Sequence, residues 1–184
     1  MRFNYAPIVD QKARDAVFER MEAEGLTASA MSSLHKPTPS QWQAITAPER
    51  GVLLGCYGPS AHPPVCGPEC GPAHDPAPLL ACAMFSPRRG RVWEFDFTTF
   101  RQWARLAVPM ARGGLGWAFA NLDCSAVIGL CPAPNRHAWR LAEACGFRVL
   151  GRLPGACLHA RKKTWVDGVL VLCTPQDLSA LLQQ

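Results

Sequence analysis

The sequence has no long hydrophobic run and no long run of basic residues. No window approaches the length of a membrane-spanning helix, and residues 1–15 lack the apolar stretch of a secretion signal. The longest basic run, residues 161–163, is too short for the positive stripe of a nucleic-acid-binding surface. We therefore expect a soluble cytoplasmic protein that has neither a membrane nor a nucleic acid as its partner.

Charge is also sparse, at 18% of residues, whereas 48% of the 184 residues are hydrophobic. This composition is that of a globular chain rather than a disordered one, and the length suits one domain, residues 1–184. The net charge of +5 favours an anionic ligand such as a nucleotide phosphate, although a solvated surface is an equally ordinary interpretation. No internal repeat is visible.

Cysteine is abundant by contrast, with nine in the chain. An odd total without a secretion signal argues against a framework of disulfides. Several of the cysteines fall within apolar patterns, where a thiol behaves as a small hydrophobic side chain. We expect these to be reduced core residues: Cys56, Cys82, Cys131, Cys145 and Cys173.

Hydrophobic periodicity predicts alternating helices and strands. Apolar residues at helical spacing predict a helix over residues 10–24, which Gly25 ends, and Ser40 is expected to cap a short helical turn at residues 40–45. Continuous or alternating apolar segments predict strands. These are residues 51–57, 79–85, 91–97, 126–131, 148–158 and 165–173.

Two segments between these elements contain helix-breaking residues. Residues 101–122 carry a helical pattern that Pro109 and the pair Gly113-Gly114 interrupt. Because proline removes a backbone donor and glycine weakens a helix, we expect a kink or two shorter helices there. Residues 58–78 are dominated by proline and glycine and predict a long irregular loop.

The most informative segment is residues 135–147, NRHAWRLAEACGF. Asn135 stands where a helix N-cap belongs, and Gly146 where a left-handed C-cap belongs. The apolar residues between them recur at i, i+3, i+4 and i+7, which is one face of a helix. They are Ala138, Leu141, Ala142 and Cys145. The pattern predicts a strand, a short loop, a capped amphipathic helix and a further strand.

This unit resembles the C-terminal half of the GNAT acyltransferase fold, whose helix typically reads N-x-x-A-x-x-L-Y-E-x-x-G-F. The predicted element order matches that fold over roughly residues 50–173, more specifically in its second half. The resemblance implies an α/β protein with a mixed, twisted sheet flanked by helices. The first strand of that fold is not obvious here, and residues 26–35 are the candidate. WEFDFTTF, WAF and residues 135–147 are also similar to GNAT-like proteins of phages and prophages.

The resemblance further implies a site for acetyl-CoA. GNAT enzymes hold it where two parallel strands splay apart, which we expect here near Phe97 and Val127, with the pyrophosphate on backbone N–H groups at the start of the following helix. The family signature Q/R-x-x-G-x-G/A falls on residues 102–107, where Arg105 replaces the expected glycine. The implied cofactor-binding residues are Phe97, Thr98, Gln102, Trp103, Ala104, Arg105, Leu106, Ala107 and Asn135.

The sequence leaves alternatives for these cofactor-binding residues. Residues 112–116 offer a second, glycine-rich phasing, but they lie far from the strand and miss the spacing by one residue. Arg105 either pairs with a phosphate or marks a loop that no longer binds CoA, since a side chain obstructs the close approach of the backbone to phosphate. Asn135, at the position that contacts the pantetheine arm in the family, is explained equally well as a helix cap.

Acyl transfer to an amine needs a base for the ammonium proton and donors for the oxyanion. Glu94 is the leading candidate for the base and Asp96 is the second, because both share the strand face opposite Trp93 and Phe95. Solvated strand carboxylates are the ordinary alternative. The family's acidic tyrosine falls on Ala142, so the acid is missing from its usual place.

Four metal-binding side chains recur at every fourth position inside the irregular loop. They are His62, Cys66, Cys70 and His74. Two imidazoles and two thiolates make a full tetrahedral zinc set, and the prolines lower the entropic cost of ordering the loop. The spacing is not the commonest one for zinc, so a surface loop with accidental ligands is the alternative.

These patterns lead to one principal functional hypothesis. We expect an enzyme that transfers an acetyl group from acetyl-CoA to an amine of an unidentified acceptor, either a small molecule or a protein. Arg105 and Ala142 favour the alternative of a non-catalytic GNAT-fold binding or assembly module. A zinc-stabilised interaction protein is a third hypothesis. The sequence does not indicate the oligomeric state.

Overall fold

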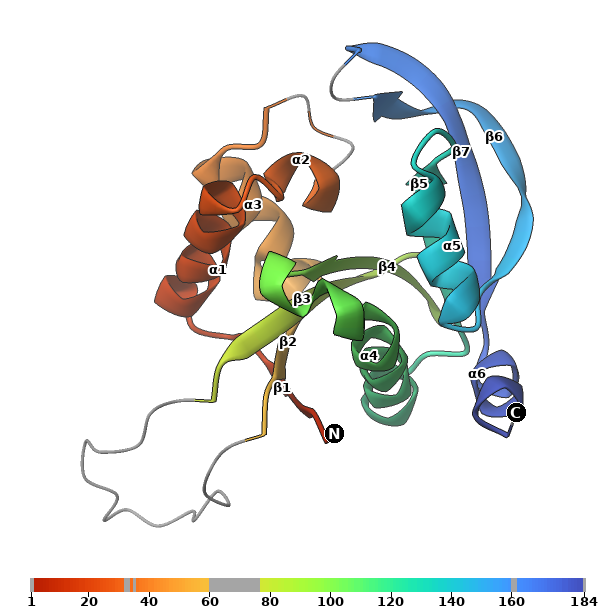
Figure 1. Ribbon diagram of the computed structural model, residues 1–184, viewed down its shortest axis with the longest axis horizontal. Coiled ribbons are helices and arrows are strands. Elements are labelled where there is room, and N and C mark those ends of the chain that lie inside the picture. The colour runs from red at the N-terminus through yellow and green to blue at the C-terminus, as the bar shows by residue number, and fades with distance from the viewer. Residues whose placement is uncertain (1, 32–33, 35, 60–76, 160–161, 184) are drawn as a thin grey trace.

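The computed structural model describes residues 2–31, 34, 36–59, 77–159 and 162–183. Its centre is a seven-stranded mixed sheet in the order β1-β2-β3-β4-β5-β7-β6 (Figure 1). The predicted α/β class with one mixed sheet is therefore confirmed. The strands are β1 Asn4–Pro7, β2 Val52–Tyr57, β3 Leu79–Pro87, β4 Val92–Thr99, β5 Ala126–Pro132, β6 Arg148–His159 and β7 Thr164–Cys173.

Helices cover both faces of this sheet. The α-helices are α1 Gln11–Ala23, α2 Thr27–Ala30, α3 Pro39–Thr46, α4 Ala107–Asn121, α5 Arg136–Ala144 and α6 Pro175–Leu182. Two 3₁₀ helices, η1 Pro48–Arg50 and η2 Arg101–Leu106, complete the described elements. Figure 1 shows α1, α2 and α3 grouped on one side of the sheet, and α4, α5 and α6 on the other.

The side chains of β2 and β3 alternate between two hydrophobic cores. Leu53 and Met84 pack with α1 and α3, whereas Leu54 and Phe85 pack with α4, α5 and α6. A strand buried on both faces reads as an uninterrupted apolar run. This explains why the sequence pattern located β2 and β3 correctly.

The predicted first strand is wrong. Residues 26–35 include the short helix α2 instead of a strand, and the first strand is β1. β1 pairs with β2 from Asn4↔Tyr57 to Pro7↔Leu54, and the Tyr5 hydroxyl donates to the Met110 carbonyl at 2.9 Å. A four-residue edge strand that depends on such distant contacts has too little periodicity to be visible in sequence.

The helix interruption predicted within residues 101–122 is also at the wrong position. The helical path changes at Leu106, where η2 gives way to α4, and α4 then runs without a break through residue 121. Pro109 lies in the first turn, where the N–H it lacks would have no intrahelical acceptor. Gly113 is required by packing, because a Cβ there would collide with the Tyr5 ring and hydroxyl.

The helix predicted over the Asn135 segment is confirmed as α5. The Asn135 Oδ1 accepts a hydrogen bond from the Ala138 N–H at 3.3 Å, and Gly146 adopts a left-handed conformation with φ of 100°. In α3 the cap is Thr38 rather than the predicted Ser40, because Thr38 forms a reciprocal capping box with Gln41. The capping box therefore places the N-cap of α3 two residues before Ser40, the position that the apolar pattern indicated.

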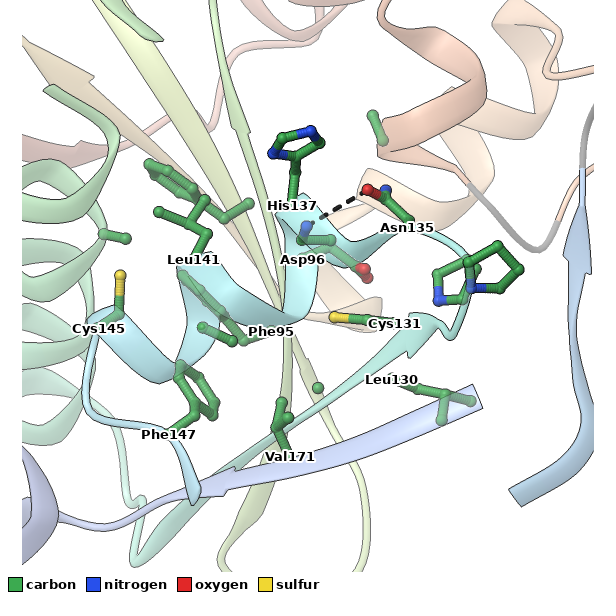
Figure 2. A pocket seen from close by; sticks show the side chains of 18 of the residues that line it. Phe95, Asp96, Leu130, Cys131, Asn135, His137, Leu141, Cys145, Phe147 and Val171 are labelled. Atoms are coloured by element: carbon green, nitrogen blue, oxygen red, sulfur yellow. Dashed lines mark hydrogen bonds between the residues drawn. The ribbon is translucent and has the colours of Figure 1, made fainter. Parts of the chain in front are cut away.

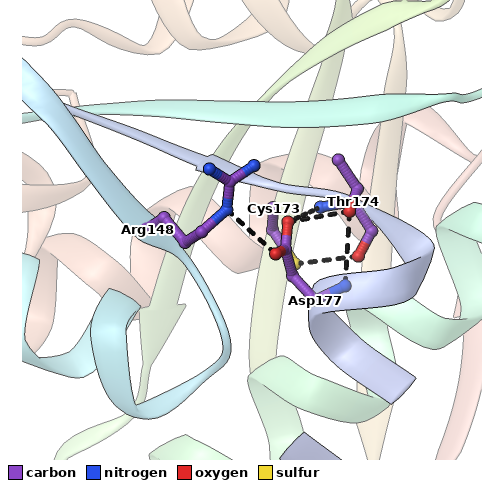
Figure 3. A network of polar contacts seen from close by, with 4 residues as sticks. All are labelled: Arg148, Cys173, Thr174 and Asp177. Atoms are coloured by element: carbon purple, nitrogen blue, oxygen red, sulfur yellow. Dashed lines mark hydrogen bonds and ion pairs between the residues drawn. The ribbon is translucent and has the colours of Figure 1, made fainter. Parts of the chain in front are cut away.

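Sequence reasoning did not identify α6, whose start carries a polar network (Figure 3). The Thr174 Oγ1 accepts from the Asp177 N–H at 3.3 Å, and Asp177 Oδ2 accepts from the Thr174 N–H at 3.0 Å. The Arg148 Nε donates to Asp177 Oδ1 at 2.9 Å. The network attaches α6 to the start of β6, directly after α5.

This network predicts a loss of stability in acid. Burial acts to raise the pKa of Asp177, but the hydrogen bonds from Thr174 and the Arg148 guanidinium outweigh it and hold the pKa below its ordinary value. The carboxylate therefore contributes stability at neutral pH that is lost as the pH falls through the lowered pKa. Thr174→Ala should cost about 1 kcal/mol in urea unfolding at pH 7. Equal acid sensitivity of the wild type and Asp177→Asn would contradict this account.

Candidate active site

The parallel strands β4 and β5 are paired over only part of their length. Their register runs from Val92↔Ala126 to Glu94↔Ile128, and beyond that point they diverge. β4 keeps β3 as its other neighbour and β5 keeps β7, so each strand has a free inner edge. The predicted parting of these two strands is confirmed, but it begins after Glu94 and Ile128, and Val127 is still paired with Trp93. Backbone N–H and C=O groups on the inner edges have no strand partner and can bind a ligand.

Aromatic side chains form the floor of the opening. The Phe95 ring lies 5.0 Å from Phe85, 5.8 Å from Phe97 and 5.9 Å from Phe147, measured between ring centroids. Phe147 directly follows the C-terminal glycine of α5, so this contact seats the helix over the gap (Figure 2). The aromatic cluster and α5 pack in the same hydrophobic core, so together they close the cavity on one face of the sheet.

The opening is a cavity of about 660 Å³. Its walls come from β4, β5, α4 and α5, with contributions from the α1–α2 region and the end of β6 (Figure 2). The lining is mainly apolar, with a few polar groups that converge on it, as is usual in ligand sites. The polar side chains are Asp96, Cys131, Asn135, His137 and His159.

Asp96 is the carboxylate of this cavity. Its side chain is exposed through the cavity opening, but protein atoms crowd the surrounding volume. This burial raises the pKa of Asp96 to about 6, and the positive charge of Arg88 opposes the shift. A carboxyl group with that pKa is ionised at neutral pH and is a stronger base than an ordinary aspartate, which suits it to accept a proton.

The Cys131 thiol lies beside Asp96. Figure 2 shows its sulfur directed toward the carboxyl group. Burial raises the pKa of Cys131 to about 11, and the charges of Asp96 and Cys157 act in the same direction. The thiol is therefore protonated at neutral pH and is not a nucleophile in this structure.

Glu94 lies outside the cavity lining. Its carboxylate forms an ion pair with the Arg88 guanidinium, and its side chain is 20% exposed. The register explains the difference from Asp96, because Glu94 still pairs with Ile128 whereas Asp96 lies beyond the point where the strands part. Of the two predicted carboxylates, the structure brings Asp96 to the cavity.

The start of α5 supplies the donors at the cavity. Asn135, His137 and Ala138 all line it. The Asn135 Oδ1 is used by the helix cap, whereas its NH₂ group makes no hydrogen bond to another residue that the structure describes. The N-terminus of α5 therefore presents donors and the positive end of the helix dipole to the cavity.

The predicted phosphate-binding segment adopts a different form from a glycine-rich loop. Residues 102–106 belong to the 3₁₀ helix η2, and Ala107 begins α4. Gln102, Ala104 and Arg105 are exposed, and Trp103 and Leu106 pack into a core. None of these residues lines the cavity.

The remaining predicted cofactor residues divide between the cavity and the core. Phe97 and Asn135 line the cavity, whereas Thr98 is buried and does not line it. In the alternative glycine-rich phasing, Arg112 instead donates to the Ala144 carbonyl at the end of α5, at 2.8 and 3.1 Å. Two of the nine predicted cofactor residues are therefore at the site.

Sequence reasoning missed Cys131 and His159 as site residues. Cys131 was predicted to be a core residue because it ends an apolar run, whereas in the structure it is half-buried at the cavity. His159 reaches the cavity from the end of β6, a position that only the curvature of the β6–β7 hairpin determines. No residue pattern in either segment carries this signal. Ala142, which the family resemblance aligns with the tyrosine, also lines the cavity.

The predicted zinc ligands lie outside the described residues. They are His62, Cys66, Cys70 and His74. Within the part of the chain that the structure describes, no group of three or more His, Cys, Asp or Glu side chains could hold a metal ion. The seven described cysteines are free thiols, and most are buried as predicted.

None of the described helices is both long enough and apolar enough to span a lipid bilayer.

Comparisons with known proteins connect this geometry to solved acetyltransferases. No family model and no curated protein sequence matches the chain. A spermidine N-acetyltransferase from Vibrio cholerae, solved with CoA and spermine, is 12% identical over 96% of this chain and 98% of its own, with a TM-score of 0.68. Aminoglycoside acetyltransferase AAC(6')-Ib, solved with coenzyme A and kanamycin, is 10% identical over 97% and 98%, with a TM-score of 0.65.

A third structure, a putative acetyltransferase from Acinetobacter baylyi, is 14% identical over 94% of this chain and 92% of its own, with a TM-score of 0.65. At these identities the likeness establishes the fold alone. The expected GNAT fold is therefore confirmed over nearly the whole chain, including the first half, where the sequence pattern was least specific.

Proposed function

We propose that this GNAT-fold protein transfers an acetyl group from acetyl-CoA to a primary amine. The observation that carries the proposal is the divergence of β4 and β5 after Glu94 and Ile128, which opens unpaired backbone edges onto a cavity that holds one carboxylate. The similar structures that contain CoA with spermine or kanamycin support the same reaction class.

The gap between the strands fits the extended acyl-pantetheine arm of acetyl-CoA. An extended chain that lies along a free strand edge can exchange hydrogen bonds with the backbone, as peptides do when they add to a sheet. Residues 129–132 of β5 offer that edge, and Asn135 adds an amide donor. The aromatic floor below excludes water from the acyl end of the arm.

We propose that the pyrophosphate of acetyl-CoA lies near the start of α4. The Ala107 N–H at the start of α4 already donates to the Ala104 carbonyl, so a phosphate here would interact with the positive end of the α4 dipole rather than with that N–H. Arg105 is exposed two residues before Ala107 and can supply positive charge where the family has glycine. Phosphate binding at Gln102–Ala107 then requires the segment to contact the ligand from outside the cavity.

The reaction follows from the groups at the cavity. Asp96 accepts the proton of the acceptor ammonium, and the freed nitrogen lone pair attacks the thioester carbonyl carbon. The C–N bond forms, and backbone N–H groups of the slot stabilise the oxyanion. The C–S bond then breaks, and the departing thiolate takes the second proton from the nitrogen to leave the amide and the CoA thiol. Because a thiolate is a tolerable leaving group, the absence of a hydroxyl at Ala142 does not prevent the last step. The carboxylate at the cavity favours catalysis over the non-catalytic module that Arg105 and Ala142 suggested.

Binding of acetyl-CoA should stabilise the folded protein. At ten times its dissociation constant, acetyl-CoA is expected to raise the free energy of unfolding by about 1.4 kcal/mol through mass action. Chemical denaturation with and without acetyl-CoA measures this change, with free acetate at the same concentration as the control. Unfolding curves that coincide at all acetyl-CoA concentrations up to the millimolar range would contradict the proposal.

A further inference from the structure

We infer that the acceptor is an amine that carries an anionic group close to the reacting nitrogen, and that polycations are poor acceptors. The inference rests on the proposed acetyl transfer and adds the class of the acceptor. It comes from the charges around the cavity, which differ from those that a polyamine or an aminoglycoside requires.

Carboxylates are scarce around the cavity. Asp96 is the one acidic side chain among the described lining residues, and the reaction uses it as the base. The walls on the acceptor side, residues 25–30 and 158–159, contain no aspartate or glutamate. A second ammonium group of a polycation would enter this cavity without a carboxylate partner and would lose its hydration without compensation.

The remaining polar groups at the cavity are donors. The His159 Nδ1 accepts a hydrogen bond from the Lys162 N–H at 3.3 Å, so the neutral ring carries its proton on Nε2. Lys162 and Lys163 are exposed in the turn that follows β6, next to this histidine in the chain. Across the cavity, the N-terminus of α5 presents its positive dipole end.

The two walls of the acceptor side therefore differ in character. Gly25 and Ala28 line the cavity without charge, whereas Leu158 and His159 bring the basic end of the β6–β7 hairpin to it. Figure 1 shows α2 and this hairpin rising on either side of the region where β4 and β5 lie. An amine held at Asp96 would direct a neighbouring carboxylate or phosphate toward the hairpin.

A panel of amines tests this inference directly. Glutamate and the dipeptide glycyl-aspartate form the carboxylate arm, phosphoethanolamine the phosphate arm, and spermidine and kanamycin the cationic arm. With saturating acetyl-CoA, we expect kcat/KM in at least one anionic arm to exceed that of both cationic amines by about tenfold or more. The two anionic arms show whether the site prefers carboxylate or phosphate.

Charge reversal at the hairpin provides the matched variants. His159→Glu combined with Lys162→Glu should lower kcat/KM for the preferred anionic amine by about tenfold or more, and by more than it weakens acetyl-CoA binding. His159→Asn alone keeps a side-chain donor, so its kcat/KM should lie between that of the wild type and that of the double variant. Lys12→Glu, on the exposed face of α1 and outside the cavity, changes the net charge as Lys162→Glu does and should have no effect.

The outcomes separate this inference from the proposed function. If acetyl-CoA binds and spermidine or kanamycin is the better acceptor, the inference is wrong and the proposed function stands. If acetyl-CoA does not bind, both fail. Thermal stabilisation of the CoA complex by each amine is measured alongside turnover. A panel without turnover in which the anionic amines also fail to stabilise the complex overturns the inference, and their preferential stabilisation supports it.

Discussion

Replacing Asp96 with asparagine is expected to lower kcat/KM for acetyl transfer by about 100- to 10,000-fold, the usual contribution of a positioned general base. Asparagine preserves the shape of the side chain but cannot accept the ammonium proton. Steady-state release of the CoA thiol measures the loss. Glu94→Gln is the matched control on the same strand, and because Glu94 is ion-paired with Arg88 outside the cavity, we expect less than a tenfold effect.

Asp96→Asn should raise the stability of the folded protein although it lowers activity. Burial raises the pKa of Asp96 from its ordinary value of 3.8 to about 6, so ionisation is less favourable in the folded chain than in the unfolded one. The resulting penalty is absent below the ordinary pKa, grows as the pH rises through the interval, and is fully present above pH 6. Asp96→Asn should therefore be more stable than the wild type at pH 7.5, and this advantage should disappear at pH 4.

The activity of the wild type should also follow this ionisation. kcat/KM is expected to increase as Asp96 loses its proton near pH 6, and the Asn variant should lack that limb of the profile. An Asp96→Asn enzyme with near wild-type kcat/KM would contradict the assignment. So would a Glu94→Gln enzyme that is the more severely impaired of the two.

Filling the cavity from α5 is expected to weaken cofactor binding strongly. Ala138 lines the cavity at the first turn of the helix, and a tryptophan there would occupy the volume that the acyl-pantetheine arm needs. We expect Ala138→Trp to weaken acetyl-CoA binding by about 100-fold, which corresponds to about 2.8 kcal/mol. Isothermal titration calorimetry measures the affinity directly.

The control for this variant lies on the same helix. Ala144 is exposed and outside the cavity lining, so Ala144→Trp makes the same chemical change without entering the site. It should bind acetyl-CoA as the wild type does. Unchanged affinity in Ala138→Trp, with both variants folded, would place the cofactor elsewhere on the protein.

The parts of the fold that sequence reasoning predicted well are those that local chemistry determines. Asn135 and Gly146 specify both ends of α5 through their own hydrogen bonding and backbone conformation. β2 and β3 are recognisable because burial on both faces demands continuous apolar residues. β1 escaped prediction because distant partners define it, among them the hydrogen bond from Tyr5 to the backbone of α4.

The site was predictable to a similar extent and for similar reasons. Asp96 and Asn135 follow from a strand and a cap that the sequence specifies locally. The contributions of Cys131 and His159 depend on where β5 and the β6–β7 hairpin bend in space, which no short-range pattern encodes. Glu94 and Asp96 share a strand face, and only the point at which β4 and β5 part decides which of them reaches the cavity.

The central claim is that acetyl-CoA lies between β4 and β5, and its most direct test is backbone amide NMR during a titration with acetyl-CoA. We predict that the largest shift changes fall on the inner edges of the two strands, residues 95–97 and 129–131, and on the first turn of α5. Saturable changes confined to other surfaces, with these strand edges unaffected, would contradict it.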